Sequence, residues 1–170
     1  MSIATTVSVE EYLATDYSPD CDFIDGVAAE RNLGRHHHSS VQTGTALWFG
    51  NRRHRLRMRV FVEHRVQVAS NRYRVPDLIV VREPVPADPV LLSAPYICIE
   101  ILSPDDSPRQ VRDRFDDYIA LGVPNNWLLD PDERRAWIAT SEGYLPCQDG
   151  VLRTIAGDVA LPIADLFDDT

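Results

Sequence analysis

Two short segments in the middle of the chain are rich in apolar residues, and each of them contains one acidic residue. Residues 73–81 contain Asp77, and residues 96–102 contain Glu100. Strands with apolar side chains on both faces lie at the centre of a sheet whose two faces are covered. Because helices usually cover such a sheet, these segments predict an α/β fold in which each of two central strands holds a buried carboxylate.

The remaining pattern predicts helices and further strands around these segments. A capping box at Ser8-Val9-Glu10-Glu11, followed by Leu13, predicts a short helix that starts near Val9. Apolar residues recur at helical spacing over residues 38–56 and over residues 111–122. Alternating runs and turn residues predict a half-exposed strand over residues 60–68, strands at 126–129 and 136–139, hairpins at Asp25-Gly26 and Asp149-Gly150, a proline-rich loop over 83–95 and a helical turn at 164–167. This order indicates a mixed sheet flanked by helices.

The length of the chain indicates one globular domain over residues 1–170. No run approaches the roughly 18 apolar residues of a membrane span, and the first six residues lack the order of a signal peptide. We therefore expect a cytoplasmic protein with no membrane partner. The three cysteines are widely spaced, which favours small apolar residues over disulfide or zinc ligands.

The basic residues are all arginine, seventeen in number, and lysine is absent. Mechanisms that need a lysine nucleophile, base or Schiff base are therefore excluded. Residues 52–74 hold eight arginines against Glu63 alone, so this stretch carries +7 and the rest of the chain −16, for a net charge of −9. The stretch could bind a polyanion such as DNA through Arg52, Arg53 and Arg55, or it could be a solvated arginine-rich surface.

The two carboxylates on the apolar strands each need a cationic partner, because an unpaired buried carboxylate costs several kcal/mol. An arginine could pair with each of them. If neighbouring strands bring Asp77 and Glu100 together, one divalent metal could instead satisfy both. Carboxylate oxygens are hard ligands, which favours Mg²⁺ or Mn²⁺ over zinc.

The residues around these carboxylates resemble a nuclease signature. Pro76-Asp77, followed after 22 residues by Glu100-Ile101-Leu102, is similar to the PD-(D/E)XK motif with Leu102 at the lysine position. Over nearly the whole chain, the order of landmarks resembles the Uma-type family of putative restriction endonucleases: Asp22-Phe23-Ile24-Asp25-Gly26, Arg74-Val75-Pro76-Asp77, Ile99-Glu100-Ile101-Leu102-Ser103-Pro104, and Tyr118 through Gly122-Val123-Pro124 to Trp127 and Asp130-Pro131. The resemblance implies a restriction-endonuclease-like fold and hydrolysis of DNA phosphodiesters with Mg²⁺ or Mn²⁺.

The resemblance also implies roles for individual residues. Asp77 and Glu100 would bind the metal, and Asp22 stands where the family usually has an outer glutamate. Arg114 matches the position to which the family moves its missing lysine; it stays protonated, so it could hold the scissile phosphate but could not act as a base. His38, the last of three consecutive histidines, matches a family histidine near the start of the long helix and joins the candidate nucleic-acid contacts.

The sequence is also compatible with other functions. A nucleic-acid-binding or oligomeric interaction protein on the same fold, including a homodimer, would need only arginines at the two carboxylates, and the loss of lysine favours such a protein. RNA or another phosphodiester could also replace DNA as the substrate. Bound Mg²⁺ or Mn²⁺ would distinguish the enzyme from the binding protein.

Overall fold

The computed structural model describes residues 6–32 and 34–167, and its largest sheet has six strands in the order β10-β9-β8-β7-β6-β3. These strands are β3 (Met58–Val62), β6 (Leu78–Arg82), β7 (Ile97–Ile101), β8 (Asn125–Asp130), β9 (Arg135–Thr140) and β10 (Gly143–Pro146). β7 and β8 pair in parallel, and the other neighbours are antiparallel. The sheet is therefore mixed, with the predicted Glu100 strand β7 near its centre.

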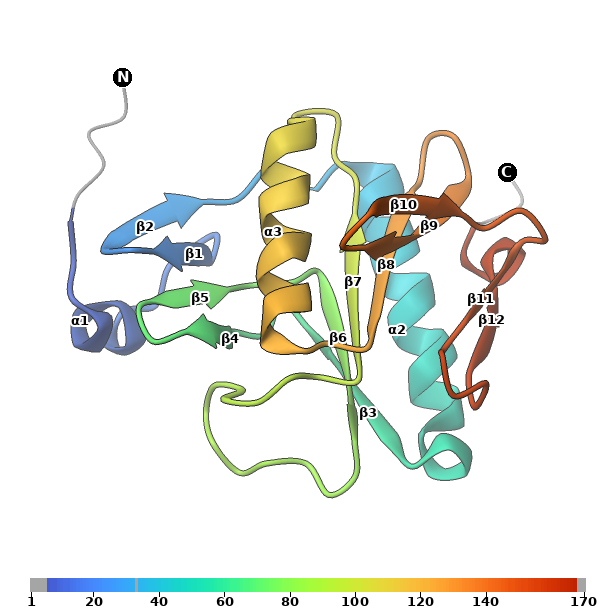
Figure 1. Cartoon of the computed structure of the whole chain (residues 1–170), viewed down its shortest axis with the longest axis horizontal. Coiled ribbons are helices and arrows are strands. Elements are labelled where there is room, and N and C mark those ends of the chain that lie inside the picture. The colour runs from blue at the N-terminus through green and yellow to red at the C-terminus, as the bar shows by residue number, and fades with distance from the viewer. Residues whose placement is uncertain (1–5, 33, 168–170) are drawn as a thin grey trace.

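A second sheet has the order β2-β1-β5-β4, and a third consists of β11 and β12. Their strands are β1 (Cys21–Ile24), β2 (Val27–Glu30), β4 (Val66–Ala69), β5 (Arg72–Arg74), β11 (Val151–Arg153) and β12 (Ala160–Pro162). Figure 1 shows the four-stranded sheet beside α1 (Val9–Ala14) at one side of the molecule. β11 and β12 lie at the opposite side (Figure 1).

Two long helices cover the six-stranded sheet from opposite sides, α2 (His36–Leu56) behind the central strands and α3 (Pro108–Leu121) in front of them (Figure 1). β7 shows how the sheet divides its side chains, because successive residues of a strand point to opposite faces. Ile97, Ile99 and Ile101 pack in the cluster that contains the apolar side of α2, whereas Cys98 packs with α3. Glu100 contacts α3 residues and so lies on the α3 side. The predicted mixed α/β fold flanked by helices is confirmed.

α3 begins and ends at sequence signals, whereas α2 begins at His36, two residues before the expected start, without a side-chain cap. α3 has a capping box at Ser107 with Gln110, and it ends at Gly122, whose φ of +93° favours glycine. α3 also connects the parallel strands β7 and β8, as a crossover helix does. None of the helices in the described ranges combines the length and hydropathy that a membrane-spanning helix needs.

Two predicted strands are wrong in their extent, because each is divided between the two larger sheets. The strand expected over 60–68 becomes β3 and β4, with a break at Glu63, which has a left-handed φ of +50°. The segment 73–81 becomes β5 and β6, separated at Pro76, which has no N–H to donate to a strand ladder. The two breaks meet, since Glu63 N donates to Asp77 O at 3.1 Å. Asp77 therefore lies at the junction between sheets.

The hairpin predicted at Asp149-Gly150 is also wrong. β10 pairs with β9 through the turn at residues 141–142, and β11 pairs with β12. Gly150 does make a turn, with φ of +72°, but the strands on its two sides are not partners. The hairpin at Asp25-Gly26, the loop over 83–95, the strand pair β8 and β9, and the helical turn η1 (Ile163–Leu166) are confirmed.

Candidate functional site

Asp77 lies immediately before β6, and its carboxylate replaces a missing backbone acceptor. The ladder between β6 and β7 ends at the pair Leu78 and Ile99, so Ile101 N donates to Asp77 Oδ2 instead, at 2.7 Å. Asp77 Oδ1 accepts a hydrogen bond from Arg31 Nη2 at 2.9 Å. The side chain is almost fully buried, and these contacts hold it against β7.

Glu100 lies on β7, one residue before the backbone N–H that binds Asp77, and is 1% exposed. Its Oε1 accepts a hydrogen bond of 2.5 Å from the Tyr118 hydroxyl on α3. Its Oε2 lies 3.3 Å from Arg114 Nη1 and 3.5 Å from Arg31 Nη2. The structure thus gives both Glu100 oxygens a donor.

Arg31 brings the two carboxylates together through one nitrogen, since its Nη2 contacts both Asp77 and Glu100. It follows β2 directly, in the segment that leads to α2. Sequence reasoning missed this residue, because it belongs to no periodic pattern; only the general requirement for a cation between two buried acids pointed to such a group. From the sequence, either an arginine or a metal could pair with the two acids, and in the structure an arginine contacts both.

Arg114 approaches Glu100 from α3. Its other terminal nitrogen, Nη2, lies 3.1 Å from Asp106 Oδ1, in the loop between β7 and α3. The residue is 8% exposed. Arg114 therefore links the acidic pair to this loop, and the contacts described for it include Glu100 but not Asp77.

Asp22 forms its contacts outside the acidic pair. From β1, its Oδ2 lies 2.9 Å from Arg74 Nη1, and its Oδ1 accepts from Val75 N at 2.8 Å. Arg74 also contacts Asp117 of α3. The buried Asp22 therefore anchors the strand that leads to Asp77, and its described contacts do not include Asp77 itself.

His38 lies with the acidic pair rather than with the arginine-rich end of its helix. In the first turn of α2, its Nε2 is 3.4 Å from Asp77 Oδ2, and the residue is 7% exposed. Burial lowers the pKa of His38, but the hydrogen bond and charge of Asp77 outweigh this and raise it above its ordinary value.

Arg52, Arg53 and Arg55 lie in the last turns of the same helix. They are at least 14 residues beyond His38, which at 1.5 Å a residue is about 21 Å along the helix axis. Arg52 stacks over the Trp48 ring at 4.2 Å, and Arg53 Nε donates to His54. The structure does not bring these arginines to the carboxylates.

The environment shifts the pKa values of the two acids in opposite directions. Burial raises the pKa of Glu100 to about 7, against the opposing charge of Arg114. Burial acts on Asp77 in the same sense, but Arg31 and the hydrogen bonds from His38 and Ile101 bring its pKa below the ordinary value. Asp77 is thus the permanently charged member of the pair, and Glu100 is the member that can take up a proton near neutral pH.

The chemistry of the pair suits a divalent metal of the magnesium type, since both donors are carboxylates. A cleft of about 120 Å³ reaches the site, with Arg31, His38, Gln42, Glu63 and Asp77 in its lining. No cluster of three or more metal-ligating side chains occurs in the described ranges, so water and backbone oxygens would complete the coordination of any ion. An ion bound to both acids also requires the Arg31 guanidinium to leave its present position.

Comparison with known proteins finds a matching family model and similar solved structures. The family model described as "Uma2: Putative restriction endonuclease" matches residues 9–163. A crystal structure of a putative nuclease belonging to DUF820, from Anabaena variabilis, is 26% identical, with a TM-score of 0.76 and with 95% of this chain and 97% of that chain covered. A comparison with curated proteins gives no match. The matched residues include Asp22, His38, Asp77, Glu100 and Arg114.

Proposed function

Because the chain belongs to the Uma2 family of putative restriction endonucleases, we propose that it is a Mg²⁺- or Mn²⁺-dependent nuclease that hydrolyses DNA phosphodiester bonds. Asp77 and Glu100 would bind the metal, in the manner of the PD-(D/E)XK superfamily. The proposal treats residues 1–170 as one restriction-endonuclease-like domain. The observation that supports it most is that two buried carboxylates from adjacent parts of the sheet contact one cationic nitrogen.

The surrounding residues prepare these carboxylates for a metal. Ile101 N orients Asp77, and the Tyr118 hydroxyl orients Glu100, so neither acid has to give up rotational freedom when an ion binds. When bound, the ion would polarise the scissile phosphate and make water a better nucleophile at neutral pH. Fixed ligands of this kind are what precise placement of an ion requires.

Arg114 provides the positive charge that a lysine supplies elsewhere in the superfamily. Its pKa is raised further because Glu100 and Asp106 outweigh the effect of burial, so it remains charged throughout the working range. It could hold a phosphate oxygen and stabilise the charge that develops there, but it could not remove a proton from water. Asp22 acts indirectly in this proposal, by fixing Arg74 and Val75 beside the site.

Arg31 has a different part in the proposal. Its guanidinium neutralises the acidic pair, and it must move aside before a metal can bind both carboxylates. The segment that holds it connects β2 to α2, so the movement involves a loop and leaves the sheet intact. Metal binding and the present position of Arg31 therefore exclude each other.

A second candidate function is a nucleic-acid-binding or oligomeric protein without catalysis. It is favoured by one observation, which is that Arg31 and Arg114 already neutralise Asp77 and Glu100 without a metal. In both candidates Arg52, Arg53 and Arg55 would contact phosphates. Both leave open whether the protein works as a homodimer and whether RNA replaces DNA.

Thermal unfolding in the presence of Mn²⁺ distinguishes the two candidates. A metal that binds only the folded protein raises its stability by RT ln(1 + [L]/Kd). We expect Mn²⁺ to raise the melting temperature of the parent and to have little effect on Asp77→Asn, whose single amide oxygen can still accept from Ile101 N. Asp105→Asn, at an exposed acid near the site, is the control and should respond like the parent. An equal response of Asp77→Asn and the parent would place the ion elsewhere.

A further inference from the structure

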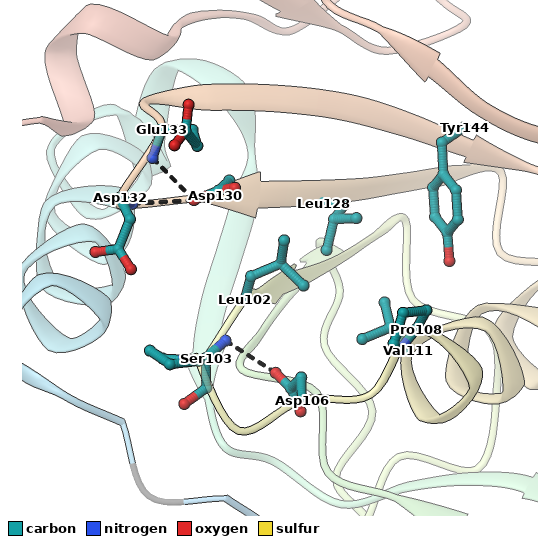
Figure 2. Close-up of a pocket in the computed structure, with 11 residues that line it drawn as sticks. Leu102, Ser103, Asp106, Pro108, Val111, Leu128, Asp130, Asp132, Glu133 and Tyr144 are labelled. Carbon is teal, nitrogen blue, oxygen red and sulfur yellow. Dashed lines mark hydrogen bonds between the residues drawn. The ribbon is translucent and has the colours of Figure 1, made fainter.

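A second cavity, of about 460 Å³, lies on the α3 side of the sheet. Figure 2 shows that it is enclosed by the loop from Leu102 to Pro108, the end of β8, the turn after β8 and the Tyr144 ring of β10. It lies at the carboxyl ends of β7 and β8, the parallel pair, which is where open α/β sheets bind ligands. Its size is in the range of small-molecule sites.

The interior of the cavity is mostly apolar. The side chains that form it come from the loop after β7, from α3 and from β8, namely Leu102, Pro104, Pro108, Val111 and Leu128. Such walls favour an apolar ligand body, because its transfer from water is favourable by about 25 cal/mol for each Å² buried.

Two hydroxyl groups at this cavity have no hydrogen-bond partner among the described residues. Ser103 is 7% exposed and lines the cavity; its backbone N donates to Asp106, but its Oγ is buried and unpaired. The Tyr144 hydroxyl is likewise buried and unpaired, and Figure 2 shows its ring reaching from β10 toward Pro108 and Val111. Leaving buried polar atoms unpaired costs about 1–3 kcal/mol each, so both hydroxyls favour a polar ligand atom.

The charge of the cavity is negative. Its lining includes four acids and no basic residue among the described residues: Asp106, Asp130, Asp132 and Glu133. Asp106 is neutralised by Arg114, and Asp132 contacts His37 at 2.8 Å. Asp130 Oδ1 accepts the backbone N–H groups of Asp132 and Glu133, as Figure 2 shows, and the Glu133 carboxylate has no described partner.

We propose that this cavity binds a small organic cation, in which a primary ammonium group faces Glu133 and Asp130 and an apolar body lies against Leu102 and Leu128. The ammonium supplies the positive charge that the rim lacks, and it also donates a hydrogen bond to Ser103 Oγ, which has no partner among the described residues. Phosphates and carboxylates are excluded by the same rim. The site is separate from the acidic pair, since neither Asp77 nor Glu100 lines it.

Calorimetric titration with 2-phenylethylamine tests the charge requirement, with 2-phenylethanol as a neutral ligand of the same shape. We expect the amine to bind with a Kd of about 1 mM or tighter and the alcohol to bind about tenfold more weakly. Glu133→Gln and Ser103→Ala should each weaken the binding of the amine about three- to tenfold. Glu142→Gln removes an exposed acid that does not line the cavity and should bind the amine like the parent.

Three results would overturn the proposal: no binding of the amine, equal binding of amine and alcohol, or unchanged amine binding in both Glu133→Gln and Ser103→Ala. Circular dichroism of each variant establishes that it is folded. Asp77→Asn separates this site from the proposed nuclease, because it should abolish the Mn²⁺ response and leave amine binding unchanged. If the amine instead bound at the acidic pair, Asp77→Asn would abolish its binding. That result would also contradict the proposal.

Discussion

Arg31 distinguishes the acidic pair of this protein from two bare carboxylates. Its guanidinium nitrogen contacts Asp77 at 2.9 Å and Glu100 at 3.5 Å, and the two acids raise the pKa of Arg31 in spite of burial. An internal cation at this position competes with a metal for the same oxygens. The apparent metal affinity is then reduced by the fraction of molecules in which Arg31 is docked.

Replacing Arg31 should therefore improve metal binding. We expect Arg31→Gln to bind Mn²⁺ about tenfold more tightly than the parent, because the competing charge is gone, and to be less stable without metal, because the two acids then repel each other. Calorimetric titration measures the affinity. Arg35→Gln, at an exposed arginine four residues away, is the matched control. Weaker Mn²⁺ binding in Arg31→Gln would show that Arg31 supports the ion rather than competes with it.

Glu100 should make the stability of the protein depend on pH. Its pKa is about 7 in the folded protein, against an ordinary 4.5, so between these values the folded state binds more protons than the unfolded state. The contribution of Glu100 to the free energy of unfolding therefore falls as pH rises from about 4.5 to 7, and it is constant above that range.

Glu100→Gln removes this titration. We expect the difference in unfolding free energy between the parent and the variant to move in favour of the variant from about pH 5 to pH 7 and then to level off. Urea unfolding at intervals over this range measures it, and Glu142→Gln, at an exposed site, should follow the parent. Parallel curves for parent and Glu100→Gln would mean that Glu100 titrates normally.

At the scale of the elements, the sequence predicted the helices and the central strands but not the division between sheets. Periodicity identifies α2, α3 and β7 because their burial is local and regular. It could not show that the chain crosses between sheets at Glu63 and Pro76, since each break depends on the strand partner beyond it. Pro76 marks one of these breaks, and the Asp77 carboxylate lies beside it.

The candidate site was likewise predictable only in part. Asp77 and Glu100 stood out as single acids in apolar segments, and Arg114 followed from the resemblance to the Uma-type family. Arg31 and the Asp22–Arg74 pair were not predictable, because they depend on how β1 and β2 meet the central sheet. His38 was expected among the nucleic-acid contacts, and the structure places it beside Asp77.

The far end of α2 carries the arginines that we propose bind DNA. Changing Arg52, Arg53 and Arg55 together to glutamine should weaken binding similarly for all sequences and lower the slope of log K against log salt by up to about 3, because each phosphate contact releases about one counterion. Binding measured by fluorescence anisotropy at several salt concentrations tests this expectation.

A control variant should lose the same charge elsewhere. Changing Arg109, Arg135 and Arg153, which are exposed arginines outside α2, also removes three positive charges. It should reduce affinity less and leave the salt slope closer to that of the parent. Equal behaviour of the two triple variants would mean that only net charge matters and that the end of α2 makes no specific phosphate contact.

For the whole molecule, a net charge of −9 restricts how a polyanion can approach. The stretch from residue 52 to 74 carries +7, and it contributes the end of α2, β3, β4 and β5. DNA held there would be repelled by the rest of the surface, including the acidic rim of the second cavity. The arginines at the end of α2 thus favour phosphate, and the acidic rim of the second cavity favours cations.

The most direct test of the account is metal-dependent cleavage of supercoiled DNA by the parent, Glu100→Gln and Arg114→Ala, purified identically and assayed with Mg²⁺ and with Mn²⁺. The account predicts cleavage by the parent that requires the metal, is abolished in Glu100→Gln, and falls by a factor of about 10² or more in Arg114→Ala through loss of charge stabilisation at the phosphate. Cleavage that survives in Glu100→Gln, or no cleavage by the folded, metal-loaded parent, would contradict it.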